Sequence, residues 1–154
     1  MSRIASEMIQ VYVCRQTDNT PPEFLVLLRA DDETLYPGVW QVITGSIEPG
    51  ESAPCAAKRE LFEETGFHTE FLHVVPYVAS FYLAETDTVH LVPVFAAIVA
   101  VDATPRISNE HMEFRWLPKE EAKQLLAFPS HRDGLDILTT FVLGAGSSGI
   151  SNTA

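Results

Sequence analysis

The chain has 154 residues, of which 46% are hydrophobic and 20% are charged, and these values are typical of one globular domain. Its formal net charge of −11 comes from 21 acidic and 10 basic residues. Binding to duplex nucleic acid depends on Lys and Arg side chains, so this charge argues against a duplex-binding protein. No apolar run approaches the roughly 20 residues needed to cross a bilayer, so we expect no membrane segment.

The first half of the chain predicts strands separated by polar loops, followed by a helix. Apolar and β-branched residues predict strands over 8–14, 23–28 and 40–43. A helix is predicted between Ser52, which can cap its start, and Gly66, which suits the left-handed residue that ends a helix.

The second half continues the mixture of strands and helices. Apolar runs predict strands over 67–75, 77–83, 90–101 and 113–117, and two helices over 118–126 and about 132–143. The segment 144–154 is rich in Gly and Ser, which indicates a flexible tail. We therefore expect a single domain over 1–143 followed by this tail.

Redox chemistry and targeting are inferred from the two cysteines and the N-terminus. Cys14 and Cys55 form no CxxC motif, and the first residues lack the long apolar core of a secretion signal. Both observations favour a reducing, cytoplasmic environment.

The segment 45–67, GSIEPGESAPCAAKRELFEETGF, carries the clearest chemical signal. Glu60, Glu63 and Glu64 are three and four residues apart, so they share one helix face. They lie in the last turns, where the helix dipole disfavours carboxylates and like charges repel. A bound cation would offset both effects. Carboxylates without His or Cys suit hard cations such as Mg²⁺, Mn²⁺ or Ca²⁺ rather than zinc.

Two further features support a cation site that binds phosphate. Glycine at positions 45 and 50 allows the backbone before the helix to approach an ion closely. Arg59 lies four residues before Glu63 and can orient it through a bidentate pair. Ions held in this way commonly bridge to substrate phosphates and activate water.

These residues match the Nudix box, G-x5-E-x7-R-E-U-x-E-E-x-G-U, in which U is a bulky apolar residue. The matching positions are Gly45, Glu51, Arg59, Glu60, Leu61, Glu63, Glu64, Gly66 and Phe67. The chain therefore resembles the Nudix hydrolase family. The resemblance implies an α+β fold, an α/β/α sandwich with a mixed β-sheet between helices. It also implies attack of water on a phosphorus atom of a phosphoanhydride.

The resemblance also implies roles for individual residues. Glu60, Glu63 and Glu64 would bind Mg²⁺, with Mn²⁺ as a substitute, and Gly45 would add its backbone carbonyl. Glu63 and Glu64 would be catalytic, while Glu51 and Arg59 would brace the loop and the helix. The alternatives are a solvated acidic face, a helix that anchors a structural Ca²⁺, and a box that no longer catalyses.

The flanking sequence resembles the subgroup that acts on dihydroneopterin triphosphate and dATP. The resemblance rests on residues 40–46, WQVITGS, and on residues 109–117, NEHMEFRWL. By this resemblance, Glu110 would be a further metal ligand or the general base; its alternative is an exposed loop acid. Glu113 is the competing choice, but an alternating strand would turn it to the other face.

Three residues are candidates for substrate binding. Arg29 can hold terminal phosphates, Trp40 can stack on a base or pterin ring, and Tyr82 lies on a strand that can line a pocket. A surface position is the alternative for Arg29, and core packing is the alternative for the two aromatic residues. Tyr82 stands where members acting on ADP-ribose carry proline, and close to where members acting on dinucleoside polyphosphates carry tyrosine.

The sequence therefore predicts an Mg²⁺-dependent pyrophosphohydrolase with a small-molecule phosphoanhydride substrate. The favoured substrates are nucleoside triphosphates and dihydroneopterin triphosphate, which would yield a monophosphate and pyrophosphate. The alternatives are hydrolysis of a dinucleoside polyphosphate or another nucleoside diphosphate derivative, and a Nudix-fold sensor that binds its ligand without cleaving it. A homodimer is left open, because no segment shows an interface.

Overall fold

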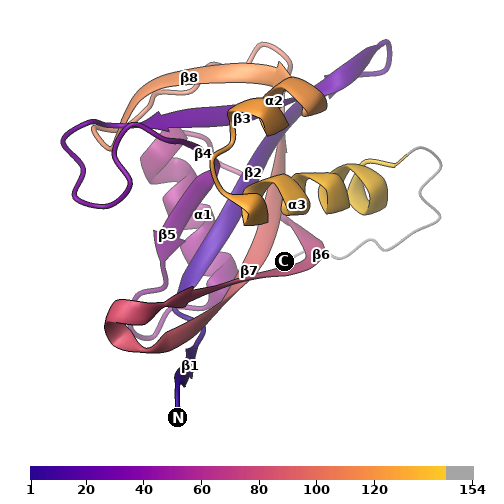
Figure 1. The fold of residues 1–154 in the computed structure, drawn as a ribbon. Helices are drawn as coiled ribbons and strands as arrows, with labels where there is room; N and C mark the ends of the chain where they lie inside the picture. The colour runs from indigo at the N-terminus through magenta and orange to yellow at the C-terminus, as the bar shows by residue number, and fades with distance from the viewer. Residues whose placement is uncertain (145–154) are drawn as a thin grey trace.

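A mixed eight-stranded β-sheet forms the middle layer of the molecule (Figure 1). The computed structural model describes residues 1–144, so the tail predicted over 144–154 lies outside the described residues except for Gly144. The strands run in the order β1-β7-β2-β3-β4, while β5, β6 and β8 pair with β2, β7 and β3. The strand bounds are Arg3–Ala5 (β1), Met8–Thr17 (β2), Thr20–Arg29 (β3), Trp40–Gln41 (β4), Ile43–Ser46 (β5), His73–Leu83 (β6), Thr88–Val99 (β7) and His111–Pro118 (β8).

Helices cover both faces of this sheet (Figure 1). Helix α1 (Ala53–Thr65) packs on one face, and α2 (Lys119–Leu125) and α3 (Pro129–Ile137) pack on the other. A π-helical turn, Leu138–Val142, continues α3, and a short 3-10 turn, Ala84–Thr86, joins β6 to β7. The predicted α+β sandwich with a mixed sheet between helices is confirmed. Among the described residues, no helix is both long enough and apolar enough to cross a membrane.

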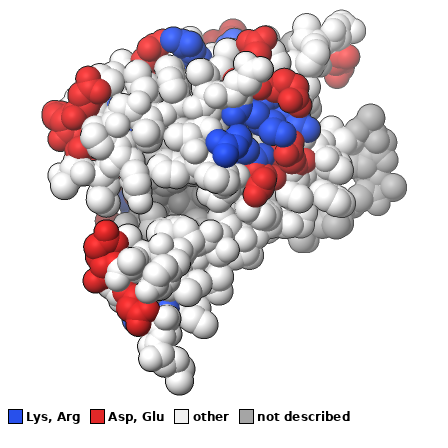
Figure 2. Space-filling model, viewed as in Figure 1, with Lys and Arg blue, Asp and Glu red and all other residues white. Residues whose placement is uncertain are grey.

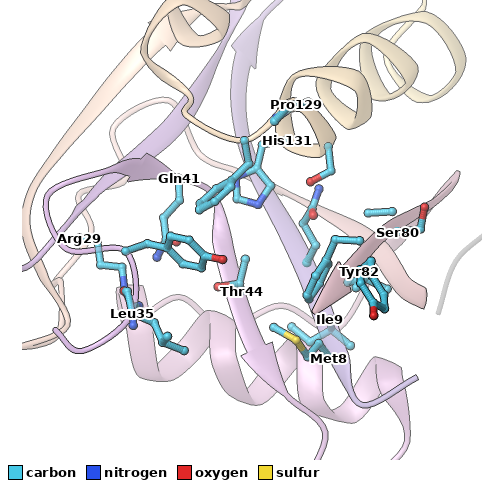
Figure 3. A pocket seen from close by; sticks show the side chains of 17 residues that line it. Met8, Ile9, Arg29, Leu35, Gln41, Thr44, Ser80, Tyr82, Pro129 and His131 are labelled. Atoms are coloured by element: carbon cyan, nitrogen blue, oxygen red, sulfur yellow. The ribbon is translucent and has the colours of Figure 1, made fainter. Parts of the chain in front are cut away.

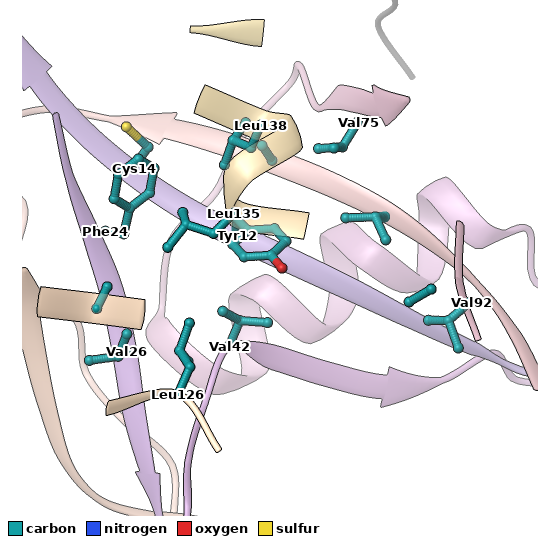
Figure 4. Packing of buried hydrophobic residues seen from close by; sticks show 14 residues of the cluster. Tyr12, Cys14, Phe24, Val26, Val42, Val75, Val92, Leu126, Leu135 and Leu138 are labelled. Atoms are coloured by element: carbon teal, nitrogen blue, oxygen red, sulfur yellow. The ribbon is translucent and has the colours of Figure 1, made fainter. Parts of the chain in front are cut away.

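The central strand β2 is buried on both sides. Ile9, Val11 and Val13 join the core cluster under α1, whereas Tyr12 and Cys14 join the cluster under α3. Figure 4 shows Tyr12 packed beside Leu135 and Leu138 in the second cluster. Each such apolar side chain contributes about 1.5–3 kcal/mol on burial, so two cores fix the sheet between the helices.

Two predicted strands, 67–75 and 77–83, are instead a loop followed by one strand. The strand begins only at His73, because the hydroxyls of Thr65 and Thr69 accept hydrogen bonds from the backbone N–H groups of Phe67 and Phe71, both at 3.1 Å. Such local bonds compete with pairing in a sheet. The register of β6 against β7 shifts between residues 74 and 78, and this irregularity accommodates Pro76, which lacks an N–H.

Two further differences from the prediction are the start of α3 and a short strand near the N-terminus. Helix α3 begins at Pro129 rather than near residue 132, because proline suits the first turn, where N–H groups need no partner within the helix. Strand β1 was not predicted, since its three residues, Arg3–Ala5, show no strand pattern. It pairs in parallel with β7, so it depends on a distant partner.

Gly134 permits the close approach of α3 to β2. A side chain at this position would overlap the hydroxyl of Tyr12. That hydroxyl donates to the backbone carbonyl of His131 at 2.6 Å and accepts from Gln10 at 2.8 Å. The contact therefore ties the first turns of α3 to the middle of the sheet.

We expect Gly134→Ala to lower the free energy of unfolding by about 1–3 kcal/mol, because it overpacks this contact. In the double variant with Tyr12→Phe, the added methyl group should cost less than it does alone, since the overlapping oxygen is gone. Urea unfolding of the wild type, the two single variants and the double variant measures the coupling between residues 12 and 134. Strictly additive losses would show that the two residues do not compete for this space.

Candidate active site

The loop and helix from β5 to α1 carry the predicted box residues. The hydroxyl of Ser52 caps α1 by accepting from the backbone N–H of Cys55 at 3.4 Å. Gly66 ends the helix in the left-handed conformation, at φ 75°, and its N–H donates to the carbonyl of Phe62. Both predicted ends of the helix are confirmed.

Arg59 is the centre of the polar contacts in this segment. Its guanidinium donates to both carboxylate oxygens of Glu51 at 2.9 Å and to the backbone carbonyl of Ser46 at 2.9 Å. It also donates to Glu60 at 2.9 Å and to Glu63 at 3.2 Å. A planar, permanently charged group with several donors suits this role better than an ammonium group. Arg59 therefore joins the end of β5, the loop and the helix face.

Glu60 lies against the backbone of Gly45. A side chain at position 45 would overlap the carboxyl group of Glu60, so this pairing requires glycine. Burial raises the pKa of Glu60, and the nearby charges of Glu63 and Glu64 raise it further, although Arg59 acts in the opposite direction. A cation beside this carboxylate would therefore relieve an unfavourable charge.

Glu64 is buried and points toward the segment before β8. Its Oε2 lies 2.8 Å from Nδ1 of His111 and accepts from the hydroxyl of Ser108 at 2.9 Å. Burial acts to raise the pKa of Glu64, but the contacts with His111 and Ser108 outweigh it and hold this pKa below its usual range. Glu64 is thus held as a carboxylate by residues distant in the sequence.

The structure separates the two acids that compete for the role of base. Glu110 precedes β8 and lies beside Glu64; burial raises its pKa, and the charge of Glu64 adds to this effect. Glu113 lies on β8, is partly exposed, and accepts from Arg115 at 2.9 Å. Only Glu110 therefore joins the carboxylates of α1.

These donors fit a hard divalent cation. The carboxylates of Glu60, Glu63, Glu64 and Glu110 and the carbonyl of Gly45 supply oxygen alone, which is the ligand type that Mg²⁺ prefers. Within residues 1–144, no His, Cys, Asp or Glu side chains already form a group of three or more suited to a metal. Arg59 engages Glu60 and Glu63, while His111 and Ser108 engage Glu64.

A pocket of about 450 Å³ opens on the face of the sheet that carries α3 (Figure 3). Its wall is mainly aromatic and apolar, with a few polar side chains. Aromatic lining comes from Tyr36, Phe81, Tyr82 and Phe128, and polar lining comes from Gln10, Arg29, Gln41, Thr44, Ser130 and His131. Such a pocket suits a planar ring held by a few hydrogen bonds.

Strand β5 connects this pocket with the carboxylates. Thr44 lines the pocket, whereas the next residue, Gly45, lies against Glu60 on the side of α1. Among the described strands β5 pairs only with β2. The pocket and the carboxylates are therefore joined through adjacent residues of this short strand.

The three candidate substrate-binding residues have different surroundings. Arg29 and Tyr82 line the pocket, but Trp40 does not. The indole of Trp40 packs against the core, and the guanidinium of Arg115 lies over it at 4.8 Å. Arg29 is already engaged, since it donates to the carbonyl of Leu35 at 2.6 Å and to Glu33 at 3.3 Å.

Several residues of the site were not anticipated from the sequence. Ser108 and His111 contact Glu64, Gln41 contacts His111, and Tyr36 and Phe128 form part of the pocket wall. The one available signal was that Gln41, Ser108 and His111 stand in or next to the segments 40–46 and 109–117, which resemble the subgroup. Tyr36 and Phe128 belong to no motif, because the fold brings them to the pocket.

The model of the NUDIX domain family matches residues 8–136. This chain belongs to the Nudix family of pyrophosphohydrolases, which are enzymes acting on acid anhydrides. It is 35% identical over 115 residues to the asymmetrical bis(5'-nucleosyl)-tetraphosphatase of Rattus norvegicus, a match that covers 73% of this chain and 76% of that protein. It is also 40% identical over 98 residues to an octanoyltransferase of Myxococcus xanthus, covering 62% of this chain but 27% of that protein.

Solved structures show the same fold. A binary complex of a C. elegans Ap4A hydrolase superposes with a TM-score of 0.75 at 21% identity, covering 91% of this chain and 99% of that one. The E. coli dihydroneopterin triphosphate pyrophosphohydrolase superposes with a TM-score of 0.65 at 27% identity, covering 88% of this chain and 96% of that one.

The ion pair between Arg59 and Glu51 predicts how stability depends on pH. Hydrogen bonds from Arg59, and then from the backbone N–H of Glu48, lower the pKa of Glu51 from its usual 4.5. The contribution of this ion pair to the free energy of unfolding is therefore complete at pH values above the usual pKa. It is lost as the pH falls through the lowered pKa. We expect Glu51→Gln to be less stable than the wild type at neutral pH, and we expect this difference to disappear in acid.

Urea unfolding of both proteins between about pH 7 and about pH 3 measures this difference. Glu23→Gln is the matched control, because Glu23 also pairs with one arginine, Arg15, but far from the box. A gap between Glu51→Gln and the wild type that stays constant down to the lowest pH would contradict the assignment.

Proposed function

We propose that this enzyme is an Mg²⁺-dependent pyrophosphohydrolase that converts a nucleoside triphosphate or dihydroneopterin triphosphate to its monophosphate and pyrophosphate. The observation that carries the proposal is the position of β5 between a ring-sized pocket and the carboxylates of α1. A pocket of about 450 Å³ suits one ring system and its sugar or side chain. The likeness to the dihydroneopterin triphosphate enzyme, at 27% identity, supports the same choice.

The charge around the pocket supports a cation-dependent reaction. Figure 2 shows that this face is hollowed between two groups of acidic side chains. The net charge of −11 adds to the repulsion that a triphosphate would meet. Mg²⁺ held by Glu60, Glu63, Glu64, Glu110 and the Gly45 carbonyl would neutralise phosphate charge and activate water.

The protein side chains would orient the reaction. Arg59 contacts Glu60 and Glu63 together, and Glu110, beside Glu64, would accept the proton of the attacking water. Arg29 would hold terminal phosphates after exchanging its contact with Glu33 for them. The free thiols of Cys14 and Cys55 support a cytoplasmic location.

A dinucleoside polyphosphate is the second candidate substrate. The relative with 35% identity is named for such a reaction, and Tyr82 lines the pocket beside Phe81 with its ring more than half exposed. An exposed aromatic ring at the pocket edge can stack on a second base.

The proposal is tested by separating and identifying the products formed from nucleoside triphosphates, dihydroneopterin triphosphate and dinucleoside polyphosphates. Each reaction is run with Mg²⁺ or with EDTA. We expect a triphosphate to give its monophosphate and pyrophosphate only when Mg²⁺ is present. Turnover of dinucleoside polyphosphates alone would favour the second candidate. Ligand binding without any product would favour a sensor.

Removing a cation ligand should abolish most of the activity without unfolding the protein. We expect Glu63→Gln and Glu64→Gln to lower kcat by about a hundredfold or more. Glu113→Gln is the matched control, because Glu113 is an acid of the same type that pairs with Arg115 instead. Steady-state kinetics on the best substrate measures the effect. A Glu64→Gln enzyme that keeps more than about a tenth of the wild-type kcat would overturn the role of this residue.

A further inference from the structure

The side chain of Gln10 lines the pocket, although only 2% of the residue is exposed. Its amide nitrogen lies 2.8 Å from the hydroxyl of Tyr12, and this hydroxyl lies 2.6 Å from the backbone carbonyl of His131. Gln10 and Tyr12 belong to β2, whereas His131 belongs to the first turn of α3. Two hydrogen bonds in sequence therefore connect the pocket with the start of α3.

Donor and acceptor chemistry fixes the orientation of the Gln10 amide. A backbone carbonyl only accepts, so the single hydrogen of the Tyr12 hydroxyl is donated to His131. Burial raises the pKa of Tyr12, so the hydroxyl keeps this hydrogen. The hydroxyl then offers Gln10 a lone pair, and only the nitrogen end of an amide can donate to it. The amide is therefore held with its nitrogen toward Tyr12.

The oxygen of the same amide is the end that a ligand can reach. A Cβ atom at Gly134 would lie 3.2 Å from Nε2 of Gln10, so α3 closes over the nitrogen end. Within the described chain the oxygen has no hydrogen-bond partner, and the fully buried polar side-chain atoms without a partner are two histidine nitrogens. The oxygen is therefore accessible, and it is accessible in a residue that lines the pocket.

The neighbour of this oxygen across the sheet suits an amino group on a planar ring. Thr44 lies directly opposite Gln10 in the pairing of β2 with β5, and it also lines the pocket. Opposite residues of an antiparallel pair have Cβ atoms about 4.5–5.5 Å apart. A threonine hydroxyl can accept as well as donate, so the two side chains can receive both hydrogens of one amino group. A ring carbonyl in this place would set its lone pairs against the oxygen of Gln10.

We propose that Gln10 is a specificity-determining residue, whose fixed amide oxygen makes the pocket select rings with an exocyclic amino group. Adenine, cytosine, guanine and a 2-aminopterin belong to this class, whereas uracil and hypoxanthine do not. A free glutamine can turn its amide and present either an acceptor or a donor, so it does not discriminate between amino and oxo groups. Tyr12 removes this freedom. The proposal rests on the proposed function for the reaction, but ring recognition can be measured by binding alone.

The first test measures the binding of nucleoside monophosphates to the wild type by isothermal titration calorimetry with Mg²⁺ present. AMP and IMP differ by an amino or an oxo group, as do CMP and UMP, and GMP differs from IMP by an added amino group. We expect the amino member of at least one pair to bind about tenfold tighter or more, because its partner leaves the oxygen of Gln10 unpaired. The proposal is overturned if no pair shows this preference, which includes the absence of any binding.

Two variants test whether Gln10 and Tyr12 cause the preference. Gln10→Met removes the amide oxygen at similar size, so it should weaken binding of the amino member about tenfold and leave its partner nearly unchanged. Gln10→Leu serves the same purpose if the methionine protein does not fold. Tyr12→Phe keeps the oxygen but frees the amide to turn, so it should bring the two affinities together by strengthening binding of the oxo member.

The controls make the same substitutions outside the hydrogen-bonded chain. Gln124→Met changes an exposed residue of α2, and Tyr77→Phe removes a hydroxyl from a residue that packs on the same core cluster as Tyr12. Neither residue lines the pocket. A preference that survives removal of the Gln10 amide, or a control that abolishes it equally, would overturn the role of Gln10. A preference that survives in Tyr12→Phe would overturn the fixed orientation.

Failure of this proposal can be distinguished from failure of the proposed function. If the binding preference depends on Gln10 but no triphosphate is hydrolysed, the proposed function fails and the recognition role stands. If triphosphates are hydrolysed but amino and oxo rings are equal in binding and in kcat/KM, the proposed function stands and the role of Gln10 fails.

Discussion

The site depends on the hydrogen bonds and ion pairs made by the guanidinium of Arg59. It contacts a carbonyl at the end of β5, the loop carboxylate of Glu51, and two glutamates of α1. Without this charge, the acidic loop and the acidic helix face would repel one another. One planar group contacts acceptors on the strand, on the loop and on the helix. These three segments must therefore lie close together. The carboxylates are thereby placed before any cation binds.

The sheet extends this local arrangement to the rest of the molecule. Strand β5 is held by β2, whose two faces are buried under different helices. Alternation along β5 then puts Thr44 in the pocket and Gly45 beside Glu60. The pocket and the carboxylates lie on opposite faces, yet they are one residue apart in the chain. In the proposed reaction, this short strand would set the distance between the bound ring and the phosphates.

Sequence reasoning succeeded where the signal is local. Spacing placed Glu60, Glu63 and Glu64 on one face, and the ends of α1 followed from Ser52 and Gly66. It could not find contacts made by strands far apart in the chain. Arg115 covers Trp40 only because β8 and β4 both pair with β3. The same long-range pairing brings Gln41 beside His111 and His111 beside Glu64, contacts that join three segments distant in the sequence. The six residues before β6 were predicted as part of a strand but form a loop. Threonine hydroxyls accept hydrogen bonds from backbone N–H groups of this loop.

Glu64 shows why the local and long-range parts of the site must act together. A buried carboxylate is costly unless charged or polar groups surround it. The box supplies this acid at a helix end, where the dipole also opposes it. Ser108 and His111 compensate from another segment, and both contact the same oxygen, Oε2. Any rearrangement that brings Glu64 to a cation must therefore preserve or replace these contacts. The surroundings of this carboxylate are therefore set by residues outside the family motif as well as by the motif itself.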